Sequence, residues 1–226
     1  PGWHVYLKNP AESGAPSRVR WDLPNGFSAG DLRWPCPAKW NQAGLTTYGY
    51  EDEVALVVTI HVSDDVQPGT YMLGADLNWL ECREVCLPAR QRIDRKIQVG
   101  PVDTPSKDHV EIRSALEALP PVTQLPIEVR WADAPTSNDE RILVFRWNAP
   151  NSVRADSVDF YPHPGDGYEV AGQTDRAQTD STIALRKRGL KSTGDWPADV
   201  DGLWVFQETT GTHRAGMVRI PILVPE

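Results

Sequence analysis

The sequence predicts a mainly β protein, built from sandwiches of antiparallel sheets with one short helix. Gly and Pro together make up about one in six of the 226 residues, and both destabilise helix interiors whereas turns tolerate them. Short runs of alternating or β-branched residues lie between turn signals such as Pro24-Asn25-Gly26 and Gln67-Pro68-Gly69. Strands at such spacing, without helical periodicity between them, are typical of antiparallel sandwiches.

Five segments of the first hundred residues have the patterning of strands. Alternation or β-branched residues mark each of them. The segments are 3–7, 18–23, 54–62, 70–80 and 92–99. We expect them to form one antiparallel sandwich.

The strand patterning stops at residues 100–108, which have the composition of a linker. Apolar side chains recur at roughly helical spacing directly afterwards, at Val110, Ile112, Leu116 and Leu119. Ser106 is placed to cap this segment, and Pro120-Pro121 ends it. One short helix is therefore predicted here.

Strand patterning resumes beyond the helix. It covers 127–131, 141–147, 157–161, 182–187, 203–207 and 217–224. At about 150 residues per domain, the length allows one large or two small domains. We predict two, residues 1–104 and 105–226, with the helix near the start of the second and a second β-sandwich after it.

The charge balance limits the classes of partner. The net charge is −8, from 23 Lys and Arg against 31 Asp and Glu, and nucleic acids and anionic membranes are recognised through basic patches. No apolar stretch approaches the ~20 residues that span a bilayer. Because the chain begins at Pro1, we interpret it as a processed or excised portion of a longer protein, without direct insertion into a membrane.

The densest chemical signal is a pair of thiols, Cys82 and Cys86, four residues apart. In an extended strand four residues span about 13 Å, whereas a disulfide needs Cα atoms roughly 4.4–6.8 Å apart. A helical turn or a tight hairpin loop would each bring the thiols close enough. A bridge across so short a loop removes little entropy from the unfolded chain. Reversible exchange therefore explains the pair better than stabilisation does.

Other interpretations of the pair remain open at this stage. The two residues could be ordinary buried cysteines or a static disulfide in a purely structural interaction domain. They could also bind copper(I), with Cys36 as a third thiolate, in a copper-binding β module. The five histidines are scattered without ligand spacing, at positions 4, 61, 109, 163 and 213. No histidine is adjacent to the thiols in sequence, so we expect no strongly depressed thiol pKa. Cys36, the odd cysteine, is interpreted as a free or buried thiol without a role.

The segment Gly26-Phe27-Ser28-Ala29-Gly30 matches the nucleophile-elbow pattern of hydrolases. That elbow requires a strand, a sharp turn and then a helix. Here Pro35 and Pro37 follow closely, so no helix is expected. We interpret Ser28 as a loop residue and not as a nucleophile.

A set of short motifs resembles the N-terminal periplasmic domain of the DsbD family of thiol:disulfide interchange proteins, in particular its ScsB-like branch, associated with copper tolerance. The motifs are Gly2-Trp3-His4-Val5-Tyr6, Lys8-Asn9-Pro10, Ser13-Gly14, Leu23-Pro24, Gly26-Phe27-Ser28-Ala29-Gly30, Trp34-Pro35 with Pro37, Tyr48-Gly49-Tyr50-Glu51 and Cys82-Arg83-Glu84-Val85-Cys86-Leu87-Pro88. The resemblance covers nearly all of residues 2–99. Three residues, rather than the five of DsbD, separate the two cysteines.

The resemblance implies an immunoglobulin-like fold and a function in electron transfer. Electrons from a transmembrane domain and a thioredoxin-like domain of the same polypeptide would reach this domain, which would reduce thioredoxin-fold proteins of the periplasm. Carried over from the family, Cys86 would be the attacking thiol and Cys82 the resolving one. We expect neither a cofactor nor a metal in this function.

Overall fold

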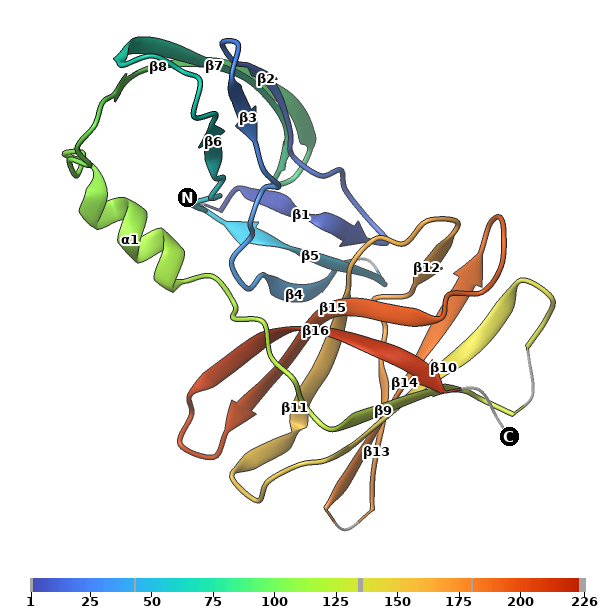
Figure 1. Ribbon diagram of the computed structural model, residues 1–226. Helices are drawn as coiled ribbons and strands as arrows, with labels where there is room; N and C mark the ends of the chain where they lie inside the picture. Colours follow the sequence, from blue (N-terminus) through green and yellow to red (C-terminus); the bar gives the residue numbers. More distant parts are fainter. Residues whose placement is uncertain (1, 43, 134–135, 180, 224–226) are drawn as a thin grey trace. The chain divides into compact units, whose positions relative to one another are not determined.

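The fold is mainly β, as the sequence predicts. A computed structural model describes residues 2–42, 44–133, 136–179 and 181–223. Strands make up 58% of it and helix 4%, and its sheets of antiparallel strands are consistent with β-sandwich architecture (Figure 1).

The first hundred residues contain eight strands, which precede the helix. They are β1 (His4–Ala11), β2 (Arg18–Asp22), β3 (Phe27–Ala29), β4 (Ala38–Gln42), β5 (Leu45–Glu51), β6 (Ile60–Val62), β7 (Gly69–Cys82) and β8 (Cys86–Val99), followed by α1 (His109–Glu117). Eight more strands follow the helix. They are β9 (Ile127–Trp131), β10 (Glu140–Asn148), β11 (Val153–Pro162), β12 (Tyr168–Val170), β13 (Asp175–Thr179), β14 (Thr182–Lys191), β15 (Asp199–Glu208) and β16 (His213–Leu223).

By its contacts the chain divides into two compact units. The first unit consists of Pro1–Pro10, Gly14–Lys39 and Tyr48–Leu119, and the second of Ala11–Ser13, Trp40–Thr47 and Pro120–Glu226. In this division α1 is counted with the first unit. The predicted domain boundary near residue 104 stays a prediction.

A six-stranded sheet, mainly in the first unit, carries the two cysteines. Its strands have the order β2-β7-β1-β5-β4, and β8 pairs with β7 outside this path. The pairing of β7 with β8 is continuous from Gly69 opposite Val99 to Cys82 opposite Cys86. The two strands therefore form one long hairpin, drawn as a curved two-stranded ribbon in Figure 1.

The prediction of a strand over residues 54–62 is partly wrong. Only Ile60–Val62 forms a strand, which pairs with β3, and Val57 makes an isolated bridge to Arg33. The β-branched residues favour an extended chain, but a ladder forms only where a partner strand runs alongside. The same pairing with β6 places Ser28 in β3, and not in a loop as expected.

The second unit is organised by an eight-stranded sheet of order β11-β15-β16-β9-β10-β14-β12, with β13 paired to β14. Among its ladders, the pairing of β16 with β9 is parallel. The predicted strand over 217–224 corresponds to β16, except that Val224 lies outside the described residues.

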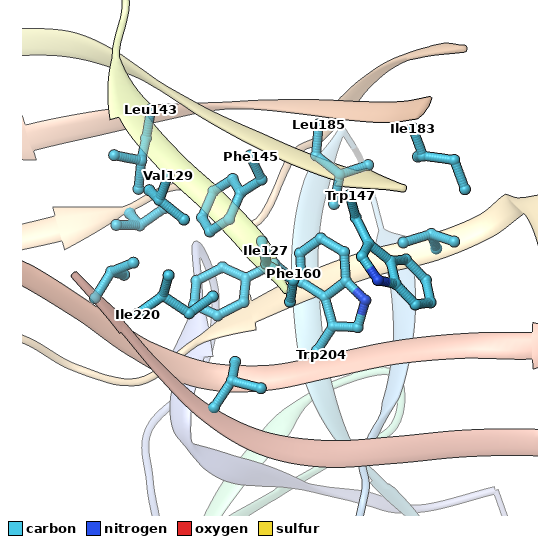
Figure 2. Packing of buried hydrophobic residues seen from close by; sticks show 14 of the residues in the cluster. Ile127, Val129, Leu143, Phe145, Trp147, Phe160, Ile183, Leu185, Trp204 and Ile220 are labelled. Atoms are coloured by element: carbon cyan, nitrogen blue, oxygen red, sulfur yellow. The ribbon is translucent and has the colours of Figure 1, made fainter. Parts of the chain in front are cut away.

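A continuous apolar cluster fills the second unit (Figure 2). The ring of Phe145 on β10 lies 4.7 Å from that of Phe160 on β11 and 6.0 Å from that of Trp204 on β15. Strands from both ends of the sheet path thus contribute to one core, as in a sandwich.

One buried ion cluster lies in the same unit. The Lys187 ammonium is fully buried, donates hydrogen bonds to the carbonyls of Ala171, Gly172 and Gln173, and lies 3.6 Å from a carboxylate oxygen of Asp159. Asp159 also pairs with Arg176 at 3.0 Å. Buried charges persist only when paired and hydrogen-bonded, and this ammonium is both.

The predicted helix is confirmed as α1, but its start differs from the expectation. Asp108 is the N-cap residue, and no side chain caps the helix. The Ser106 hydroxyl instead accepts a hydrogen bond from the Asp108 backbone N–H, in the turn that precedes the helix. The apolar residues Val110, Ile112 and Leu116 are exposed.

Candidate redox site

The tip of the β7–β8 hairpin forms the site. Cys82 ends β7, Cys86 begins β8, and the two are paired across the ladder with Cα atoms 4.1 Å apart. The Arg83 N–H donates to the Val85 carbonyl and closes the tight turn between them. Of the two local geometries that the spacing allows, the chain therefore adopts the hairpin, and a disulfide joins Cys82 to Cys86.

The two sulfur-bearing residues differ in exposure. Cys82 is 2% exposed and belongs to the buried set of the first unit, whereas Cys86 is exposed. Directly beside Cys86, Val85 and Leu87 are 62% and 46% exposed. A thiol of another protein can therefore approach Cys86, and apolar surface lies on both sides of it.

Two aromatic side chains of β1 line the buried side of the site. The Tyr6 hydroxyl lies 3.7 Å from the Cys86 sulfur and 3.3 Å from the His4 Nε2 atom. His4 faces Cys82 in the ladder between β1 and β7, and its ring packs edge-on against that of Tyr6. Tyr6 is 2% exposed, so its hydroxyl meets the disulfide from within the fold.

The electrostatics around this group are mixed. Burial lowers the pKa of His4, and the nearby Glu51 carboxylate opposes that shift. Arg83 and Glu84 lie in the exposed turn between the cysteines. The hydroxyl that contacts the disulfide belongs to Tyr6, a residue distant in sequence.

Sequence reasoning found both cysteines but missed His4 and Tyr6. It weighed the charges adjacent to the thiols, the spacing of the five histidines and Cys36 as a third ligand, but not which strand would lie beside the thiols. The signal that could have found them is the alternation His4-Val5-Tyr6, because residues two apart on a strand share one face of the sheet. Which strand lies beside the hairpin tip is a matter of tertiary pairing, and the residues alone do not specify it.

Cys36 has no disulfide partner. The residue as a whole is exposed, yet burial of its sulfur environment raises the pKa of the Cys36 thiol to about 11. Tyr50, whose hydroxyl donates to the Pro35 carbonyl, also has a raised pKa, through burial first and the nearby Cys36 second. The fold holds this thiol in its protonated form.

The alternative of a three-thiolate metal site is not supported by the arrangement of side chains. Within the part of the chain that the structure describes, no group of three or more His, Cys, Asp or Glu side chains could hold a metal ion. In the same residues, no helix is long and apolar enough to cross a membrane.

Comparison with known proteins gives one match. Residues 1–97 match the family model described as thiol:disulfide interchange protein DsbD, N-terminal. No curated protein and no solved structure matches the chain. The matched segment includes both cysteines and both aromatic residues of the site, so the first 97 residues are similar to the N-terminal domain of a thiol:disulfide interchange protein.

Proposed function

We propose that the first unit is a protein-disulfide reductase domain of the periplasm, which passes electrons from a membrane-embedded relay to oxidised thioredoxin-fold proteins. The observation that carries the proposal is the difference in exposure between the two sulfur-bearing residues, with Cys86 exposed and Cys82 buried. A disulfide used only for stability does not need an exposed cysteine. The match of residues 1–97 supports the same chemistry.

The reaction has two exchange steps, and in each step one S–S bond breaks while another forms. The reduced Cys86 thiolate attacks a sulfur of the partner disulfide, so that a Cys86–partner bond forms and the second partner sulfur leaves as a thiolate, which takes a proton. The Cys82 thiolate then attacks the Cys86 sulfur, and the first partner sulfur leaves with the remaining electron pair. Two electrons reach the partner, and the Cys82–Cys86 disulfide is restored.

The turn supports these roles by its geometry. Cys82 and Cys86 face each other across the ladder, so Cys82 lies beside any mixed disulfide formed at Cys86. Val85 and Leu87 offer apolar contacts to a docking partner on either side of the reacting sulfur. Reduction of the restored disulfide would occur through the same exposed sulfur, attacked by the thioredoxin-like domain of the relay.

Two further proposals rest on sequence. The combination of motifs over residues 2–99 favours the ScsB-like branch and hence a function in copper tolerance. Residues 105–226 are proposed to form a separate β-sandwich domain of the same polypeptide.

Trapping of the mixed disulfide tests the central proposal. In a Cys36→Ser background, a Cys82→Ser variant incubated with an oxidised thioredoxin-fold protein should accumulate a covalent complex through Cys86, detected on a non-reducing gel. The matched Cys86→Ser variant retains the buried Cys82 and should form none. Equal trapping by the two variants, or none by either, would overturn the proposal.

A further inference from the structure

The buried side of the redox site contains a hydrogen-bonded chain from His4 through Tyr6 to Cys86. The distances are 3.3 Å from His4 Nε2 to the Tyr6 hydroxyl and 3.7 Å from that hydroxyl to the Cys86 sulfur. Both are within the range for hydrogen bonds, the second because sulfur is a large acceptor. The exchange steps written above assign no role to either aromatic residue.

The direction of hydrogen-bond donation along His4, Tyr6 and Cys86 depends on whether the His4 Nε2 atom carries a hydrogen. A hydroxyl has one hydrogen, so Tyr6 can donate to the ring nitrogen or to the sulfur, but not to both. When His4 Nε2 carries a hydrogen, it donates to the Tyr6 oxygen and leaves the phenolic hydrogen for the sulfur. When Nε2 is bare, it competes with the sulfur for that same hydrogen.

We infer that Tyr6 is a catalytic residue that donates its hydroxyl hydrogen to the Cys86 thiolate, and that His4 is a positioning residue that holds this hydroxyl toward the sulfur. This inference rests on the proposed function, in which the Cys86 thiolate attacks a partner disulfide and is released again when it leaves the mixed disulfide with the upstream donor. A hydrogen bond to an ionised acceptor is roughly twice as strong as one between neutral groups. Tyr6 therefore stabilises the charged form more than the neutral thiol.

The burial of Tyr6 strengthens the stabilisation that its hydroxyl gives to the Cys86 thiolate. Tyr6 is held in the core of the first unit and cannot turn to solvent, so its hydroxyl is oriented before the thiolate appears. His4 is partly buried, and its Nε2 atom has the Tyr6 hydroxyl within reach. Cys86 is thus an exposed residue whose sulfur has a fixed donor on the inner side of the site.

Several charged groups lie near the His4–Tyr6–Cys86 chain, and one of them, Glu51, acts on His4. Glu51, at the end of β5, favours the imidazolium form, whereas burial disfavours it more strongly. Asp52 follows β5 and accepts a hydrogen bond from the Gly2 N–H. In the hairpin turn, Arg83 lies against Gly2 and Glu84 follows it. Because burial is the larger effect, His4 titrates below its ordinary pKa of about 6.5.

The test uses iodoacetamide as the only reactant and no partner protein. The parent is Cys36→Ser with Cys82→Ser, in which Cys86 is the remaining thiol, and the rate of its alkylation is measured against pH. Tyr6→Phe should raise the midpoint of this profile by about one pH unit, the value of one hydrogen bond to a charged group. Tyr71→Phe is the matched control, because its hydroxyl donates to the Gln67 carbonyl elsewhere in the unit, and it should leave the midpoint unchanged.

Two variants of His4 separate positioning from packing. In the parent, the imidazolium form should add a shoulder to the profile below about pH 6.5, because a nearby positive charge favours the thiolate. The side chain introduced by His4→Gln supplies N–H donors but does not titrate. This variant should therefore keep the neutral-pH rate of Cys86 alkylation and lose the shoulder. His4→Phe should lose the shoulder. It should also lower the neutral-pH rate of Cys86 alkylation by roughly 2-fold, because the side chain at position 4 no longer polarises the Tyr6 hydroxyl.

The inference is overturned if Tyr6→Phe remains folded, by its thermal unfolding midpoint, and keeps the parent profile. It is equally overturned if His4→Gln retains the shoulder. Neither result bears on whether a mixed disulfide forms with a partner, so failure of this inference and failure of the proposed reductase function are distinguishable.

Discussion

The two units of the chain differ in what they bury. In the second, aromatic and aliphatic side chains from many strands form one cluster around Phe145, Phe160 and Trp204. In the first, β8 is exposed along most of its length, and its first residue is the accessible cysteine. A disulfide that exchanges with another protein, as proposed for Cys82–Cys86, cannot lie inside a packed core. The difference therefore indicates a division between stable packing and exchange chemistry, and this division can be tested.

The largest effect should follow removal of the accessible sulfur. Cys86→Ser should abolish reduction of a thioredoxin-fold partner, because the attacking species is a thiolate and serine does not supply one at neutral pH. Insulin or a purified oxidised partner serves as the substrate, with the reduced domain in excess. Cys36→Ser is the matched control and should keep full activity. Residual reduction by Cys86→Ser would contradict the assignment of the nucleophile.

The second effect should be confined to the stability of the second unit. Lys187→Met leaves the carbonyls of Ala171, Gly172 and Gln173 without this buried donor and Asp159 without its nearby ammonium. Breaking such a pair should lower the free energy of unfolding by about 3–5 kcal/mol, measured by urea unfolding with tryptophan fluorescence. The exposed neighbour Arg186→Met should change it by less than about 0.5 kcal/mol. Alkylation of Cys86 in the single-thiol parent should not change, and a change would contradict the division between the units.

A smaller effect is expected at the surface beside the sulfur. Leu87→Ala should slow partner reduction several-fold because it removes apolar docking surface, while the free energy of unfolding should change by less than about 0.5 kcal/mol. Met72→Ala is the control, since Met72 is 47% exposed on the same hairpin, toward its far end, opposite Lys96. If both variants slow the reaction equally, Leu87 does not mark a docking surface.

How well the sequence predicts each strand depends on which residues that strand buries and on its length. The strand Ile127–Trp131 alternates apolar and polar residues because one face is buried in the core, and its position was predicted correctly. The strand predicted over 182–187 continues to Lys191, because its buried positions beyond Leu185 include Lys187 and Gly189, which break the apolar alternation. Leu45–Glu51 was missed because its consecutive buried residues are threonines, tyrosines and a glycine, which do not form an apolar alternation. Short strands such as Tyr168–Val170 carry too few residues for any periodicity to be visible.

The sequence singles out the two cysteines that the disulfide joins, but not the side chains around them. Two cysteines four apart identify a local disulfide chemistry, but a helical turn and a hairpin fit that spacing equally well. The hairpin is decided by the fourteen residues on each side, whose ladder continues to Cys82 and Cys86. His4 and Tyr6 reach the site only because β1 pairs with the end of β7, a contact about eighty residues away in sequence.

The smallest effect on function concerns Cys36, the thiol that the fold keeps unreactive. Burial raises the pKa of the Cys36 thiol from about 9.0 to about 11. The thiol therefore stays protonated in the folded protein at pH values where it already ionises in the unfolded chain, and the stability that this preference contributes is fully present below pH 9.0 and is lost as the pH rises through about 11. At pH 8, iodoacetamide should label Cys36 on the order of 100-fold more slowly in the native protein than in urea, because the thiolate fraction is smaller by about that factor. Mass spectrometry of the intact protein, with the Cys82–Cys86 disulfide left oxidised, isolates this one thiol. Equal labelling in both states would mean that the fold leaves Cys36 as reactive as a free cysteine, and the contrast with Cys86 would then rest on position in the hairpin alone.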